Sequence, residues 1–232
     1  MKKVYLLGDC HTTRVYEHWN PETCPVDFKA WGLAGMTAWT FDPFELENEE
    51  KLSNGIENIN EYVKKEYPFV KKFNEFKDPD IVLVWLGYVD IRQRLPEWDN
   101  AEKDAYQILD RIRAYYTNSV IQVIEPLPQF TEMLLKYDGI SPVQTYEERQ
   151  RQNHIFCAAL NEYTKNHNML KPITQQEIKD AVGIQEFTIE HAADVFPLDQ
   201  PWHNNKKDAL KKDRWAEIYN LFINKSVDIA VD

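Results

Sequence analysis

The feature that most constrains the fold is the run from Asp80 to Gly87, DIVLVWLG, in which only apolar residues stand between an acid and a glycine. A strand with one face in water alternates apolar and polar residues, whereas a strand covered on both faces does not. The run therefore predicts a central strand of a parallel sheet with helices on both sides. Such sheets bind ligands at the carboxyl ends of their strands.

The rest of the chain repeats a strand and then a helix. Further strands are expected at residues 3–7, 26–31, 119–125 and 169–173, and helices at 12–19, 56–76 with a break at Pro68, 101–116, 147–165, 174–182 and 208–223. Apolar residues at helical spacing predict the helices, and β-branched runs closed by Gly or Pro predict the strands. The pattern indicates one α/β domain over residues 1–232, with a parallel five-stranded sheet between two helical layers.

Composition restricts the class of protein. Hydrophobic residues make up 43% of the 232 residues and charged residues 28%, which is typical of a folded globular chain. The formal net charge of -11 argues against nucleic-acid binding, because phosphate contacts are built from clustered Lys and Arg. An acidic chain is also a poor match for an anionic membrane surface.

Cysteine count and the amino-terminal segment bear on location. Cys10, Cys24 and Cys157 are an odd number without metal-type spacing, in a chain too long to need disulfides. The apolar run after Lys2 and Lys3 is shorter than the core of a signal peptide. We expect a soluble protein, cytoplasmic where it is made. A virion-associated protein would have the same features.

Four short blocks carry the residues suited to chemistry. GDCHTTR follows the first expected strand, WGLAGMT the second and LGYVDIR the third, while DQPWHNN precedes the last helix. A parallel sheet brings the first three blocks to one edge. Together the blocks supply a thiol, glycine amides, an aspartate and a histidine.

The order of these blocks resembles that of the SGNH (GDSL-type) hydrolases. Gly8-Asp9-Cys10 is similar to the family's Gly-Asp-Ser, Gly35 to the glycine of its second block, and Gly87-Tyr88-Val89-Asp90 to its Gly-x-Asn-Asp. GDCHT with GYVDIR looks most like the SGNH-like subfamily of polysaccharide-related and phage genes, which has GDSH and GxxDxR blocks. The resemblance implies a flavodoxin-like, three-layer α/β/α fold and an ester hydrolase.

The chain departs from the family pattern at three positions. Cys10 stands in place of Ser, Val89 in place of Asn, and one extra residue separates Asp199 from His203. Val89 has no side-chain donor, so the third oxyanion donor of the family is missing unless Arg92, Asn204 or a backbone amide replaces it. These departures are also what the loss of catalysis would leave.

The residues themselves suggest nucleophilic catalysis. A cysteine between a strand end and a helix start gains thiolate character from the helix N-terminus. His203 is the expected base and Asp199 the residue that orients it, while the amides of Cys10 and Gly35 are the expected oxyanion donors. Read by residue type alone, Cys10 is a small buried group.

Further residues are candidates for substrate binding. His11 either contacts substrate or bonds a backbone carbonyl, and Arg92 either pairs with Asp90 or holds an anionic group in a bidentate manner. Asp9 is expected to accept backbone amides in its turn. The remaining candidates are Trp202 and Asn204.

Tryptophans also suit the stacking of sugar rings. Trp31, Trp39, Trp85, Trp98 and Trp202 are candidates, of which only Trp98 and Trp202 are expected in loops and the others mainly in the core.

No metal or cofactor is expected, because the chain has no metal-binding motif and no phosphate-binding glycine loop. The first hypothesis is an esterase that removes O-acyl groups from a carbohydrate, with a small-molecule or glycan ester as substrate. The second is a non-catalytic module that binds a glycan or packs into an oligomer or virion.

Overall fold

The computed structural model describes residues 1–9, 11–16, 18–20, 22–33, 36–48, 70, 72–93, 100–128, 146–185 and 208–230. Its strands are β1 (Lys3–Gly8), β2 (Asp27–Gly32), β3 (Ile81–Trp85) and β4 (Val120–Val123). Its helices are α1 (His11–Tyr16), α2 (Pro43–Asn48), the short 3₁₀ helix η2 (Phe73–Glu75), α3 (Tyr88–Gln93), α4 (Ala101–Tyr115), α6 (Tyr146–Asn166), α7 (Gln175–Val182) and α9 (Asp208–Asp228).

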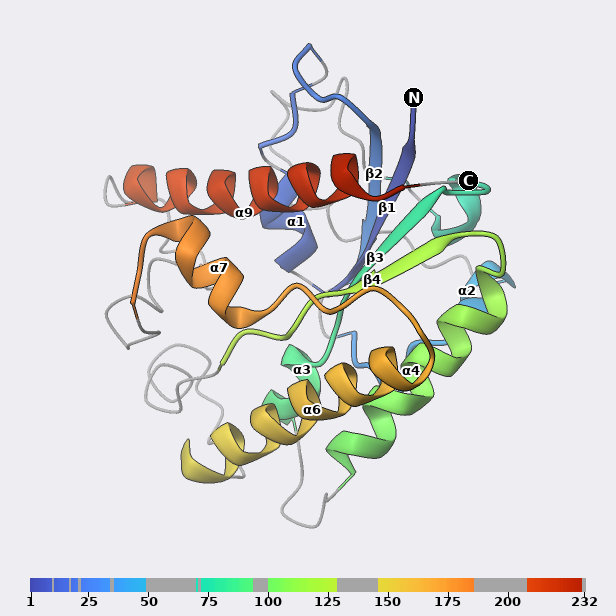
Figure 1. Ribbon diagram of the computed structural model, residues 1–232, viewed down its shortest axis with the longest axis vertical. Coiled ribbons are helices and arrows are strands. Elements are labelled where there is room, and N and C mark those ends of the chain that lie inside the picture. Colours follow the sequence, from blue (N-terminus) through green and yellow to red (C-terminus); the bar gives the residue numbers. More distant parts are fainter. Residues whose placement is uncertain are drawn as a thin grey trace.

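The four strands form one parallel sheet in the order β2-β1-β3-β4. Helices α1, α7 and α9 cover one face, and α2, α4 and α6 lie on the other (Figure 1). This confirms the three-layer α/β/α architecture and the flavodoxin-like strand order. The run 81–85 that predicted a doubly covered strand is β3, and all five of its residues are buried.

The strands fill two hydrophobic cores by alternation. Val4 and Leu6 of β1 point into the core beneath α9, while Tyr5 and Leu7 point into the core beneath α4 and α6. This period of two is the geometry of any extended strand. Here both faces of the strand are buried, so the sequence shows no polar alternation.

The fifth strand, expected at 169–173, is reduced to one bridge between Ile124 and Ile173. Ile173 donates to Val123 and accepts from Glu125, both at 2.9 Å. Pro172 has no N–H to extend the ladder. On the other side, the N–H of Thr174 is taken by the side chain of Glu177 in the capping box that starts α7. Pairing therefore stops after one residue.

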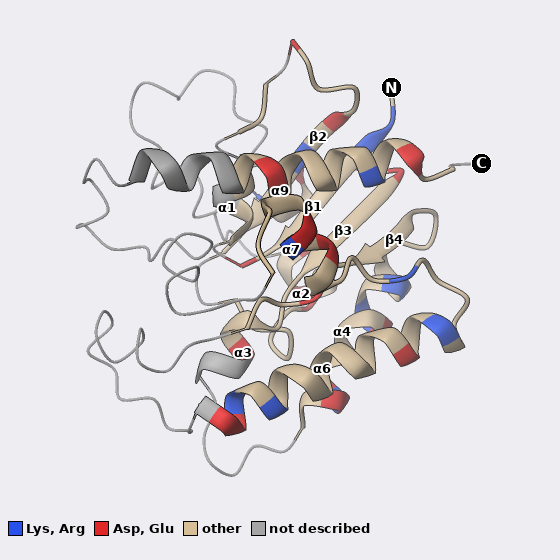
Figure 2. Cartoon of the chain, turned by 60° about the vertical axis from the view of Figure 1, so that its left-hand side comes forward, with Lys and Arg blue, Asp and Glu red and all other residues tan. Residues whose placement is uncertain are grey.

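Charged residues lie mainly on the helices and at the amino ends of β1 and β2. Along α6, basic and acidic side chains are interspersed (Figure 2). In the part of the chain that the structure describes, every helix is too short or too polar to cross a membrane.

Candidate functional site at the carboxyl edge of the sheet

The first three sequence blocks begin at one edge of the sheet. Gly8, the last residue of β1, is in register with Gly32 at the end of β2 and with Trp85 at the end of β3. The three strands therefore end at the same level, and the segments that follow them start side by side. The prediction that these blocks meet at one edge is confirmed.

Two glycines allow α1 to pack against this edge. A Cβ on Gly8 would lie 2.4 Å from the carbonyl oxygen of Trp85 and 2.6 Å from Cγ2 of Thr12, and a Cβ on Gly32 would lie 1.8 Å from Oγ1 of Thr12. Leu33 donates its N–H to the carbonyl of Gly8, which ties the end of β2 to the same turn. Both glycines are thus required by close approach of the first turn of α1.

The turn after β1 is held by Asp9, which is 1% exposed. Its Oδ1 accepts the backbone N–H of His11 at 2.9 Å and lies 3.0 Å from Nδ1 of the same residue. Its carbonyl accepts the N–H of Thr12 at 3.2 Å and the Thr12 hydroxyl at 2.7 Å. The predicted architectural role of Asp9 is confirmed. Asp9 therefore holds His11 and Thr12, the two residues that follow position 10.

His11 is 5% exposed and packs among aromatic rings. The centroid of its imidazole lies 4.3 Å from that of the Tyr88 ring, in an edge-to-face arrangement. It lies 5.9 Å from the ring centroid of Trp215, and these two rings are stacked. The ring centroid of Trp85 lies 5.4 Å from that of His11. Trp215 belongs to α9, so His11 connects the first block to the helix that follows the fourth block.

The third block starts with a glycine that no other residue replaces easily. Gly87 has a φ of 109°, and a Cβ there would lie 2.7 Å from the ring of Phe156 on α6. Val89 is 3% exposed, so this position of the third block carries a buried apolar side chain. The positive φ of Gly87 turns the chain sharply between the end of β3 and the start of α3.

Asp90 joins the third block to the loop after β2. Its Oδ2 accepts the N–H of Ala38 at 2.7 Å and its Oδ1 accepts the N–H of Trp39 at 3.3 Å. Asp90 is 1% exposed, and a carboxylate buried at this level needs such donors. Its predicted contact with substrate stays a prediction.

Several predicted site residues lie outside the described part of the chain: Cys10, Gly35, Asp199, Trp202, His203 and Asn204. The backbone of Arg92 lies in α3, but its side chain is outside the description. Their predicted roles therefore stay predictions. Three described residues at this edge were missed as site residues: Gly32, Thr12 and Trp215. The sequence signals for them were a glycine at a strand end, a helix-capping residue and an apolar position on the last helix.

A second polar group lies at the carboxyl end of β4. The carboxylate of Glu125 accepts the side-chain amide of Asn161 at 2.8 Å and the backbone N–H of Gln175, at the start of α7, also at 2.8 Å. The Gln175 amide in turn donates to the side chain of Asn153 at 2.7 Å. These bonds tie β4, α6 and α7 together. Across the described residues, no three His, Cys, Asp or Glu side chains gather as metal ligands would.

Comparison with known proteins shows similarity of fold without similarity of sequence. The sequence matches no protein-family model and no curated protein. One crystal structure superposes with a TM-score of 0.56 over 94% of this chain and 95% of its own, at 12% identity. At that identity the likeness shows the fold alone.

Two further solved structures are more distant. A Streptococcus pneumonia protein named for platelet activating factor has a TM-score of 0.49, 12% identity and coverage of 94% of this chain and 83% of its own. An acetyl xylan esterase from the rumen bacterium Butyrivibrio proteoclasticus has a TM-score of 0.38, 12% identity and coverage of 75% and 54%. Similarity at this level carries no argument about the activity of this chain.

Proposed function

We propose that the chain is an acyl hydrolase that removes O-acyl groups, above all acetyl groups, from a carbohydrate. One observation carries the proposal: the turn that follows Gly8 is fixed by Asp9 and His11 at the level where β2 and β3 also end. A nucleophile at position 10 would stand in this turn. The four sequence blocks supply the chemistry around it.

In the proposed reaction, the Cys10 thiolate attacks the acyl carbon and the sugar hydroxyl leaves. His203 takes the thiol proton and returns it to the leaving oxygen, while Asp199 orients the imidazole. Water, deprotonated by His203, then attacks the thioester and releases the acid and the free thiol. The amides of Cys10 and Gly35 would donate to the oxyanion formed in each step.

The fixed turn would contribute by holding the nucleophile in one position. Reacting groups held in attack geometry avoid much of the entropy cost of a bimolecular reaction. The brace from Asp90 to Ala38 would act in the same way on the loop that carries Gly35. Arg92, Trp202 and Asn204 are the proposed contacts to substrate.

The test is acyl release by the purified chain. We expect hydrolysis of p-nitrophenyl acetate and of an acetylated sugar, and loss of both activities in Cys10→Ala and His203→Ala. Cys24→Ala and Cys157→Ala are the matched controls and are expected to keep full activity. Hydrolysis that survives both Cys10→Ala and His203→Ala would overturn the assignment.

Val89 favours a second candidate function. Its buried valine side chain gives no donor where the family has Asn. On this ground we propose as the alternative a non-catalytic module that binds a glycan or a partner chain, including a chain of a virus particle. It predicts glycan or partner binding without turnover, and turnover of a natural ester that is lost in Cys10→Ala would exclude it.

A further inference from the structure

Among the tryptophans that the structure describes, Trp39 is the most exposed. Its side chain is 54% exposed, whereas Trp31 and Trp85 are 0% and 2% exposed. It lies in the turn between β2 and α2 and is exposed, whereas the sequence analysis expected it in the core. Single exposed hydrophobic residues are common, so exposure alone does not assign it a role.

The backbone of Trp39 is fixed on both sides. Its N–H donates to Oδ1 of Asp90 at 3.3 Å, and its carbonyl accepts Nη1 of Arg111 at 2.9 Å. The same guanidinium donates to the carbonyl of Phe41 at 3.1 Å and lies 3.6 Å from the carboxylate of Asp42. The exposed indole therefore stands on a turn held by α3 and α4. A ligand that binds it does not have to order the loop first.

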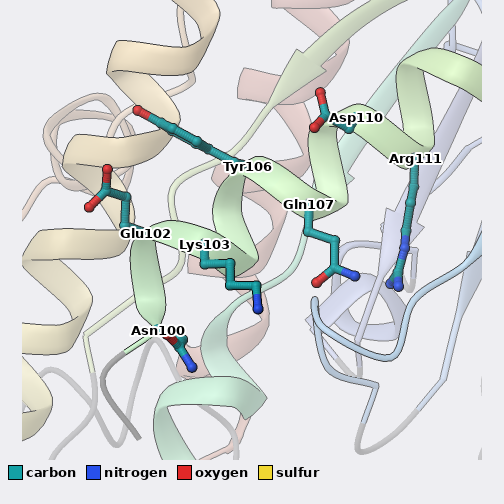
Figure 3. A pocket seen from close by; sticks show the side chains of 7 residues that line it. All are labelled: Asn100, Glu102, Lys103, Tyr106, Gln107, Asp110 and Arg111. Carbon is teal, nitrogen blue, oxygen red and sulfur yellow. The ribbon is translucent and has the colours of Figure 1, made fainter.

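Arg111 also borders a surface hollow of about 520 Å³ that runs along α4. The hollow starts at Asn100, at the end of α4 nearer the carboxyl edge, and Lys103, Gln107 and Arg111 extend to one side of the helix (Figure 3). Glu102 and Asp110 also line it, so its charges balance. Amide, ammonium and guanidinium groups with balanced charge suit a neutral ligand rich in hydroxyl groups.

We propose that Trp39 is a stacking platform for a sugar ring of the glycan that carries the acyl group, and that Lys103 and Gln107 bond the hydroxyls of neighbouring sugars. The proposal rests on the proposed function and adds the residues that would bind the sugar rings of its substrate. The broad, apolar face of an indole packs against the C–H face of a pyranose, while the sugar hydroxyls stay available for hydrogen bonds. Asp90 braces this platform from the third block, so it adjoins the catalytic edge.

A protein partner fits this surface less well. Protein interfaces have an apolar centre with few charged residues. The hollow along α4, which Arg111 connects to the Trp39 turn, is lined mainly by charged and amide side chains.

The test compares Trp39→Ala with Trp39→Phe, which keeps a ring, and with Phe44→Ala, which removes another exposed aromatic residue. The probe is an array of plant and bacterial oligosaccharides, each in an O-acetylated and a deacetylated form. We expect retention of at least one glycan, about tenfold weaker binding in Trp39→Ala, and near wild-type binding in the other two variants.

The outcomes separate this inference from the proposed function. Trp39-dependent glycan binding in a chain without esterase activity would support the platform and reject the hydrolase. Esterase activity on an acetylated glycan that is equal in wild type and Trp39→Ala would reject the platform alone. Absence of any bound glycan, or self-association in sedimentation that Trp39→Ala abolishes, would also overturn it.

Discussion

Oδ2 of Asp90 accepts a 2.7 Å hydrogen bond from the backbone N–H of Ala38, so a residue that follows β3 holds the loop that follows β2. The two segments are far apart in the sequence and adjacent at the sheet edge. A buried carboxylate that receives two amides is a stable anchor, because its charge is compensated by donors of fixed position.

We predict that Asp90→Ala lowers the free energy of unfolding by about 3 kcal/mol, because it removes a charged acceptor and leaves the amides of Ala38 and Trp39 without it. Asp90→Asn should cost less, since its carbonyl oxygen still accepts one bond. Urea unfolding followed by circular dichroism measures both. Glu45→Ala, at an exposed position of α2, is the control and should change stability by under about 0.5 kcal/mol. Equal midpoints for Asp90→Ala and wild type would contradict the anchor.

Substitution of two glycines by alanine separates strain in the backbone from a steric clash of the added Cβ. Gly87→Ala combines a φ of 109° with a Cβ 2.7 Å from the Phe156 ring, whereas Gly183→Ala has a φ of 73° and no atom within 4 Å of its Cβ. We predict a loss of about 1 kcal/mol for Gly183→Ala, from left-handed backbone alone, and a loss of more than about 3 kcal/mol for Gly87→Ala. Thermal unfolding of the two variants tests this. Similar losses would show that contact with α6 adds nothing.

The fold follows largely from patterns that are local in the sequence. The apolar run of β3 indicated the parallel sheet and its two cores, because strands covered on both faces read as continuous apolar runs. The periodicity of residues 101–116 and 147–165 located α4 and α6 to within a few residues. The fifth strand was overestimated because Pro172 has no N–H to donate and the N–H of Thr174 is used by the capping box of α7.

The candidate site was predictable only in part. Glycine and aspartate in the first and third blocks pointed to the edge, since those residue types mark strand ends and tight turns. The pairing of Asp90 with residues 38 and 39 joins segments with no sequence signal between them. The packing of Trp215 on His11 likewise depends on where the last helix crosses the sheet.

We predict that His11→Phe shows whether His11 positions the nucleophile at position 10 or contacts the substrate. Phenylalanine keeps a ring against Trp215 but loses the contact with Asp9, so the turn that carries position 10 is less fixed. On the proposed function, kcat for p-nitrophenyl acetate should fall more than about tenfold with little change in KM, because misplacement acts on the reacting step. His154→Phe, on the exposed face of α6, is the matched control. A raised KM with unchanged kcat would instead make His11 a substrate contact.

The thiols should differ in their response to pH. Burial and the Glu125 carboxylate raise the pKa of the Cys157 thiol well above its usual value, against a smaller opposing effect of the Gln175 side chain. The neutral thiol is therefore favoured in the folded state, and its contribution to stability is present below the unfolded pKa and lost as the pH rises toward the folded pKa. We predict slow alkylation of Cys157 by iodoacetamide near neutral pH in the folded protein and rapid alkylation in urea.

Cys10 is expected to behave in the opposite way. On the proposed function its thiolate forms below the ordinary cysteine pKa of about 8.5, so alkylation of the folded protein should already be rapid near pH 6. Peptide mapping by mass spectrometry across the pH range assigns each label, and Cys10→Ser should remove the rapid phase while leaving the slow one at Cys157. Rapid labelling of Cys157 in the folded protein would contradict the raised pKa of its thiol. A Cys10 that reacts only above pH 8.5 would favour the non-catalytic module over the hydrolase.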